Sequence, residues 1–352
     1  MKPRASTRLV RLFASVDRRL TVLLVGLSVV RGLLFPTLTV ASAALVGALR
    51  DGRSTTPWVL VVVGAFAVRR VLDPLVEEVG GALGRRTDEA LTSRTMAAML
   101  APAGMAHLED PLVQDRIAQA QGAVTATTPG EAARRAPLVW AGWLRGGLSL
   151  AIVAVHLPLP AVALGVTYAV GYVVSKRHWH EVTVVMYDRT DDLRRAYYLR
   201  TLALTAEAAK ETRVFGLADW LVQAYRESWL GVMRTVWTER DEAWLKVAAT
   251  SLLIGAAEVT ALLLVARDAA SGGLSLAVAV ATAGAVVAAS DLAAYDEDHW
   301  VMAEAVRATE TITALHDAES PGGVVATGTA VTDGPREALR FEGVRFTYPG
   351  AS

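Results

Sequence analysis

A long proline-free stretch, between Pro160 and Pro321, limits what this chain can fold into. Proline breaks helices, so its absence allows long helices to run without interruption. Three apolar runs lie inside the stretch, at 161–174, 247–266 and 274–289. A polar, helix-favouring segment separates the first two and is punctuated at Phe215-Gly216-Leu217. The pattern predicts two long helical arms that meet at a bend.

The predicted arms, 161–213 and 220–266, are much longer than a bilayer is thick. With a rise of about 1.5 Å per residue, each is roughly 70–80 Å long, whereas the hydrocarbon core measures about 30 Å. Each arm therefore crosses the membrane and continues about 40 Å beyond it. We expect a membrane protein that carries force or information to something outside the bilayer.

The clustering of apolar residues predicts the fold class. Hydrophobic residues make up 53% of the chain, close to the roughly 45–50% of soluble domains, so the average alone is not decisive. Six runs can span a bilayer: 20–49, 58–79, 138–157, 161–174, 247–266 and 274–289. We predict an all-α polytopic membrane protein with six transmembrane helices and long cytoplasmic extensions.

Charge distribution predicts the orientation. The formal net charge is zero, so charge gives no indication of a nucleic-acid partner. Lysine and arginine gather at the amino end and in the two long polar loops, whereas the three short loops carry only Arg50, Arg53 and Arg267. The positive-inside rule then places both termini and both long loops in the cytoplasm, in a multi-pass protein of the cell membrane.

The amino-terminal segment, 1–19, is predicted to form an amphipathic helix. Leu9, Leu12, Phe13 and Val16 share one face, and such a helix lies in the membrane interface. A frayed basic tail is the alternative. A signal peptide is disfavoured because the apolar region that follows is too long and is interrupted by Arg31.

The first polar loop repeats the plan of the second. A helix is expected to descend as far as Leu100 and to break at Ala101-Pro102-Ala103-Gly104. Asp110 then suits a helix N-cap and Pro111 the first helical position, and a further helix climbs back to the third span. Both loops thus consist of two long arms with a short element at the tip.

The chain changes character after the last span. A polar helix is expected from about Asp291 to Asp317, with Asp296-Glu297-Asp298-His299 as its solvated start. The membrane domain is assigned to 20–317 and a Gly/Thr-rich linker to 318–338. Apolar and polar residues alternate over 339–352, which predicts the first β-strands of a soluble domain.

Three patches then resemble the exporter class of ATP-binding cassette (ABC) transporters, in the type-1 half-transporter arrangement with the membrane domain first. The first is Glu109-Asp110-Pro111 with Asp115 and Arg116, the second is Ala209-Lys210-Glu211-Thr212-Arg213-Val214-Phe215-Gly216, and the third is 339–349. Together with the six spans and the two long-armed loops, the resemblance covers essentially the whole chain as architecture.

The resemblance implies that the two tips are coupling helices, which sit in grooves on the ATP-binding domains. The residues implied are Glu109, Asp110, Pro111 and Asp115 at the first tip, and Glu211, Arg213, Phe215, Gly216, Leu217 and Trp220 at the second. The apolar residues of the second tip either pack within the bundle or dock into a partner domain, and the bend at Gly216 favours docking. Tyr348, before Pro349, is implied to stack on adenine.

The sequence departs from the family where ATP chemistry is concerned. It has no G-x-x-x-x-G-K-[ST] segment, and Gly80-Gly81-Ala82-Leu83-Gly84 has the wrong spacing and no lysine. ATP and Mg²⁺ are therefore expected in a full-length protein and not on these 352 residues alone, which should not hydrolyse ATP. We expect the ATPase to follow in a longer product; its loss is the alternative.

Ionisable residues inside the predicted spans are the candidate substrate path, because charges are costly there and often functional. They are Arg31, Arg69, Arg145 and Glu258, with Arg70 beside Arg69. The alternative is that these groups form ion pairs that lock helices together. No catalytic residue and no metal site are predicted.

The prediction for function is the permease part of an ATP-driven exporter that moves an amphipathic or hydrophobic substrate out of the cytoplasm by alternating access. Its expected partners are a second half-transporter, identical or not, the ATP-binding domains, the lipid bilayer, and a small-molecule, lipid or peptide substrate. The alternative is a regulatory or sensor scaffold of the same architecture that lacks an ATPase.

Overall fold

The chain is described by a computed structural model, which covers residues 3–100, 113–114, 117, 127–188, 190–318 and 343. All regular structure within these ranges is helical. The helices are α1 (Pro3–Val16), α2 (Arg18–Arg50), α3 (Thr56–Leu100), α6 (Glu131–His156), α7 (Pro158–Asp188), α8 (Thr190–Leu204), α9 (Ala209–Val214), α10 (Ala218–Ala270), α11 (Leu276–Ala289), the 3₁₀ turn η1 (Ser290–Leu292) and α12 (Glu297–Ala318).

Five segments are long and apolar enough to cross a membrane. They are Arg18–Arg50, Glu131–His156, Pro158–Glu181, Trp244–Ala270 and Leu276–Ala314. The prediction of an all-helical chain with several membrane-length helices is thus confirmed at this level. The remaining predicted span, 58–79, lies in α3, where Arg69, Arg70 and Asp73 cut the apolar stretch short. That sixth span stays a prediction.

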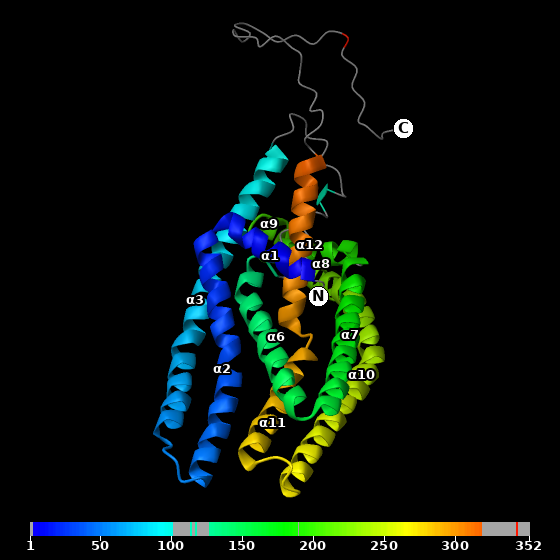
Figure 1. Cartoon of the computed structure of the whole chain (residues 1–352). Helices are drawn as coiled ribbons and strands as arrows, with labels where there is room; N and C mark the ends of the chain where they lie inside the picture. The colour runs from blue at the N-terminus through cyan, green and yellow to red at the C-terminus, as the bar shows by residue number, and fades with distance from the viewer. Residues whose placement is uncertain are drawn as a thin grey trace.

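The long helices form a bundle of antiparallel neighbours (Figure 1). The short connections after α2, α6 and α10 lie at one end of the bundle, and α1 and α9 lie toward the other. Within the bundle, α2 packs against α3, α6 and α11, and α6 also contacts α7 and α12. The central helix α6 therefore connects the two sides of the bundle.

Helix α1 packs on protein along its apolar face. Leu9 and Phe13 are almost fully buried in a core that includes Leu83 of α3 and Met302 of α12. Asp17 ends α1 and caps α2, because its Oδ1 accepts hydrogen bonds from the backbone N–H groups of Arg19 and Leu20, at 2.9 and 3.0 Å. In this structure the apolar face is therefore buried against the bundle rather than available to a bilayer interface.

The bonds to its carboxylate lower the pKa of Asp17 below its usual value. The hydrogen bond from the Leu20 backbone is the largest favourable cause, and the bond from Arg19 and the ion pair with Arg86 act in the same direction. Asp17 thus ties the start of α2 to α3.

The predicted long arm is present, with one correction. Helix α10 runs for 53 residues without interruption, about 80 Å. The expected bend falls at Gly216, whose φ of 66° lies in the left-handed region that favours glycine. The prediction of one continuous helix over 161–213 is wrong, because turns at 205–208 separate α8 from α9.

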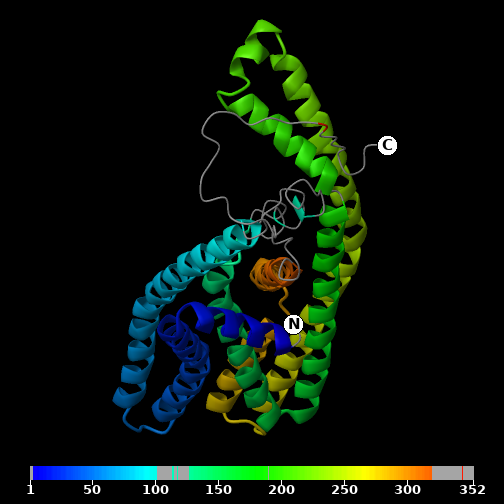
Figure 2. The same ribbon diagram turned by 90° about the horizontal axis from the view of Figure 1, so that it is seen from above.

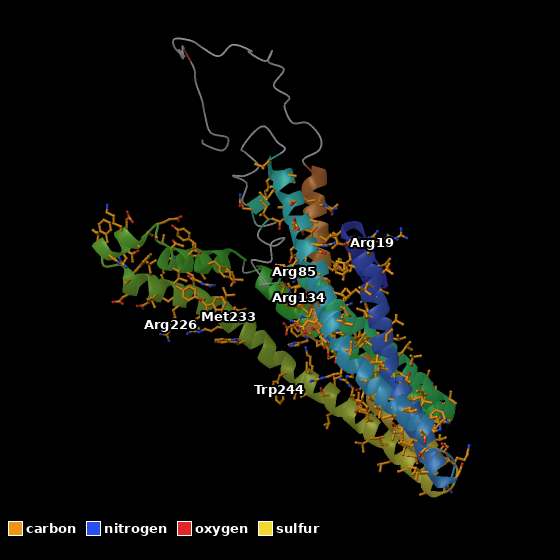
Figure 3. All side chains as sticks on the ribbon, turned by 90° about the vertical axis from the view of Figure 1, so that its left-hand side faces the viewer. Arg19, Arg85, Arg134, Arg226, Met233 and Trp244 are labelled. Carbon is orange, nitrogen blue, oxygen red and sulfur yellow. The ribbon has the colours of Figure 1, made fainter. Side chains whose placement is uncertain are left out.

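The outer part of this arm extends away from the bundle. Figure 2 shows α8, α9 and the start of α10 distant from α2, α3 and α6. In Figure 3, Arg226 and Met233 lie on this outlying part, and Trp244 lies closer to the bundle. A small cluster holds the arm together: Leu193 and Val232 are buried, and Trp229 and Met233 pack against them.

The last membrane-length segment is broken. Helix α11 ends at Ala289, η1 follows, and α12 begins only at Glu297. The expectation of a polar helix from about Asp291 is therefore wrong by six residues. Asp296 starts α12, since its Oδ1 accepts from the backbone N–H groups of Asp298 and His299, at 3.1 and 3.3 Å.

Candidate functional site

The break between α11 and α12 falls at a depth where irregular backbone is unusual. Helix α11 has 14 residues and is about 21 Å long, which is less than the roughly 30 Å of a hydrocarbon core. Non-helical backbone at such a depth is tolerated where protein buries it or where it lines a water-filled cavity. The break between α11 and α12 is therefore a candidate position for a functional site.

A cavity of about 250 Å³ lies beside this break. Helices α2 and α6, the break itself and the first turn of α12 form its walls. Its charged or titratable wall residues are Arg31, Arg145, Asp291, Asp296, Asp298 and His299. The break thus coincides with the described cavity that is richest in charged groups.

Helix α6 holds the break on both sides through ion pairs. Arg145 forms an ion pair with Asp291 of η1, the turn that directly follows α11. Arg135, almost three turns away on α6, places its Nη1 2.9 Å from Asp298 Oδ1 in the first turn of α12. Charges in a low-dielectric surrounding are costly unless they are paired, so these two contacts specify how α11 and α12 sit on α6.

Gly146 allows α6 to approach the break closely. A Cβ at this position would lie 2.8 Å from Leu292 Cγ and 3.3 Å from the Leu292 backbone nitrogen. The neighbouring Gly147 has open space at the same test position. The close contact is therefore a property of Gly146 and not of its neighbour Gly147.

His299 is buried at the base of the cavity. Its side chain is 6% exposed, and its Nδ1 lies 2.8 Å from Asp296 Oδ1. The rings of Tyr295 and Trp143 lie 5.3 and 5.6 Å away, centroid to centroid. The expectation that 296–299 is a solvated helix start holds for Asp296 and Glu297, which are exposed, and is wrong for His299, which is buried.

The predicted substrate-path arginines come together in part. Arg31 and Arg145 line the same cavity. Arg69 is linked to Arg31 through Asp73: Arg31 Nη2 lies 3.3 Å from Asp73 Oδ1, and Arg69 Nε lies 3.7 Å from Asp73 Oδ2. The geometry therefore contains both features that the sequence left open, a polar cavity and ion pairs between helices.

Glu258 lies apart from the arginines, in the α10 region that packs on α7. The buried Tyr168 hydroxyl lies 3.2 Å from both Glu258 Oε1 and the Val286 carbonyl oxygen. This contact ties α7 to α10 and α11, and Glu258 is absent from the walls of the charged cavity. The structure does not bring Glu258 together with the arginines.

The residues of the second tip gather where the arm turns. Glu211 and Arg213 are exposed on α9, Phe215 and Gly216 form the turn, and Leu217 precedes α10. Phe215 is 70% exposed, and Trp220, in the first turn of α10, is 57% exposed. The end of the extended arm thus carries large exposed apolar side chains, which are a feature of interaction surfaces in general.

Four acidic or titratable residues of the site were not predicted: Asp73, Asp291, Asp298 and His299. Asp291 and Asp298 could have been found as the carboxylates nearest to a break in the apolar pattern, opposite the arginines of the third span. Among the described residues, no group of three or more His, Cys, Asp or Glu side chains could hold a metal ion. Outside the described residues lie the predicted first-tip residues Glu109, Asp110, Pro111 and Asp115, and also Tyr348.

Comparison with known proteins gives no further assignment. No family model matches the chain, and no curated protein matches it.

Proposed function

We propose that this chain is the membrane part of an ATP-driven exporter of the ABC type, which works as a pair of such halves. The observation that carries the proposal is the arm formed by α7, α8, α9 and α10, which projects from the bundle and ends in exposed aromatic residues (Figure 2). A protein confined to the bilayer has no use for a rigid helical arm about 80 Å long.

The arm is built as a lever. Helix α10 packs along α7 and α8 and contacts α11 at its other end. A force on the tip at Phe215 and Trp220 therefore reaches α11 through one unbroken helix. The tip would dock in a groove of an ATP-binding domain, whose closure on ATP and Mg²⁺ would move the arm.

Helix α3 supplies the sixth span in this proposal. It lies beside α2, and its connection to α2 lies at the same end as the other short connections (Figure 1). The basic residues near Arg18 and Arg19, at the opposite end, support a cytoplasmic position for that end. Both termini would then be cytoplasmic, as the proposed ATP-binding domain after 318–338 requires.

The charged cavity at the helix break would be part of the substrate path. Alternating access involves movement of the spans, and a break between α11 and α12 would let the two halves of the last span move relative to each other. Ion pairs from α6 to Asp291 and Asp298 would define one of the two arrangements. The substrate itself is not specified beyond an amphipathic or hydrophobic molecule.

The test is reconstitution in lipid vesicles together with the ATP-binding domains. ATP hydrolysis should rise on addition of hydrophobic or amphipathic compounds, and the 352 residues alone should show none. A membrane-inserted protein whose ATP-binding domains hydrolyse no ATP with any such compound would contradict the proposal and favour the regulatory scaffold.

A further inference from the structure

Three arginines and one carboxylate form a cluster where α2 and α3 face each other. Asp73 of α3 contacts Arg31 of α2 at 3.3 Å and Arg69, one turn earlier on α3, at 3.7 Å. Arg70 is exposed beside them and has no ion pair among the described residues. We name Arg31, Arg69, Arg70 and Asp73 the α2–α3 arginine cluster.

The cluster carries an excess of positive charge. Three arginines against one aspartate leave two positive charges. The nearest other carboxylates on α3 are Glu77, one turn after Asp73, and Glu78, which pairs with Arg85 at 3.5 Å. The excess positive charge therefore lies on the side of the cluster nearer Thr56, with acidic residues beyond it.

The cluster is open to the outside of the bundle. The side chains of Arg69 and Asp73 are 55% and 41% exposed, and that of Arg31 is 28% exposed. Large apolar side chains of α3 are exposed both before it, at Val63 and Phe66, and after it, at Val71 and Leu75. An arginine pair framed by exposed apolar residues is the pattern of a lipid-facing surface rather than of a soluble one.

The head-group region lies within reach of the arginine side chains of the cluster. Arg69 is 13 residues after Thr56, about 20 Å along α3, so it lies roughly 10 Å from the far boundary of a hydrocarbon core about 30 Å thick. Arginine side chains extend from such a depth to the interface and place their guanidinium groups among the phosphates. Guanidinium groups also match phosphate geometry with two parallel hydrogen bonds.

We propose that the α2–α3 arginine cluster binds the anionic phosphate head group of a bilayer phospholipid, from the leaflet on the side of the chain termini. This inference rests on the proposed placement of α3 as a membrane span. Asp73 holds Arg31 and Arg69 next to each other and cancels one charge, and the remaining two positive charges attract the lipid. Basic pockets between membrane helices on the cytoplasmic side bind anionic lipids in this way.

The experiment measures lipid binding directly, without ATP or transport. The purified protein in neutral detergent is titrated with phosphatidylglycerol, and bound lipid is counted by native mass spectrometry, with phosphatidylcholine as the uncharged reference. Arg69→Gln combined with Arg70→Gln should weaken phosphatidylglycerol binding by about 25-fold, since each arginine near the surface contributes about fivefold.

Two further variants keep the test specific. Arg50→Gln combined with Arg267→Gln removes two charges at the opposite end of the bundle, so phosphatidylglycerol binding should stay unchanged. Asp73→Asn raises the excess charge while its amide oxygen can still accept hydrogen bonds from Arg31 and Arg69, so binding should strengthen by about fivefold; weaker binding would contradict the charge argument.

Several results would overturn the inference. One is equal binding of phosphatidylcholine and phosphatidylglycerol; another is an arginine variant that behaves like the control. Complete displacement of the lipid by inorganic phosphate at equal concentration would indicate a general anion site. A dimer that excludes lipid and that Arg69→Gln dissociates would assign the surface to a second copy.

Because no ATP is involved, lipid binding with an inactive ATPase would contradict only the proposed exporter function.

Discussion

The bundle and the arm are made from helices of similar length but are stabilised very differently. In the bundle, α1, α3, α6 and α12 share one extensive core with many fully buried side chains, Phe13 and Met302 among them. In the outer arm, the buried cluster consists of Leu193 and Val232 with a few partly buried neighbours, and Phe215 and Trp220 stay exposed at the tip. The described helices of the bundle share an extensive core, whereas the outer arm has a small one and leaves aromatic residues exposed, which fits the partner that we propose for its tip.

Removing a large side chain from the bundle should have the largest effect on stability. Phe13→Ala deletes a fully buried ring, which typically costs about 3–5 kcal/mol. The free energy of unfolding, measured with denaturant in detergent, should fall by that amount. A loss below about 1 kcal/mol would show that α1 contributes little to the stability of the bundle. It would contradict the difference in stability that we infer between bundle and arm.

The matching change in the arm should act locally. Leu193→Ala removes one of the two buried side chains of the arm cluster and should cost about 2 kcal/mol, the lower end for such changes. Hydrogen exchange should quicken in α8 and in the facing part of α10, while the thermal midpoint of the bundle stays the same. Equal acceleration throughout the chain would show that arm and bundle unfold as one unit.

Gly146 of α6, which faces the helix break, allows a test of the close packing inside the bundle. Gly146→Ala would place a methyl group against Leu292, and such overpacking costs about 1–3 kcal/mol. Gly147→Ala, the adjacent control, meets no atom within 4 Å and should stabilise the helix by about 0.5–1 kcal/mol. Thermal unfolding of the two variants should therefore shift in opposite directions; shifts of the same sign would contradict the close packing of α6 on η1.

The smallest predicted effect is the acid dependence at Asp17, which joins α1, α2 and α3. A lowered pKa means that Asp17 contributes stability at pH above its unfolded value of about 3.9, and that this contribution is lost as pH falls through the folded value. Asp17→Asn keeps a capping side chain but removes the charge. The stability difference between the wild type and this variant should be present at pH 6 and disappear in strong acid; a constant difference would contradict it.

The long helices and the bend of the arm could be predicted from sequence because local signals determine them. The absence of proline, the apolar runs and the glycine at position 216 are sufficient for these two predictions. The broken last span could not be predicted this way. Residues 290–296 contain no proline or glycine, and the break is stabilised by distant partners on α6, Arg135 and Arg145.

The same reason explains the uneven prediction of the site. Arginines inside apolar runs are conspicuous in a sequence, so Arg31, Arg69 and Arg145 were identified. Asp291 lies just after the apolar run 274–289, where a carboxylate is unremarkable until the fold brings it to Arg145, and Asp73, inside the run 58–79, shows its pairing with Arg31 only in the fold. The sequence around His299 is acidic and predicts a solvated position, whereas packing against Trp143 and Tyr295 buries the ring.

The central claim, that the arm tip receives force from an ATP-driven partner, is tested most directly by uncoupling the tip. ATP hydrolysis would be measured in vesicles with the ATP-binding domains, for the wild type and for Phe215→Ala combined with Trp220→Ala. Trp237→Ala, an exposed residue farther along α10, is the control. We predict that the tip variant loses compound-stimulated hydrolysis by about tenfold or more, as expected for aromatic anchors of an interface, while the control retains it. Stimulation that is equal in all three proteins would contradict the account.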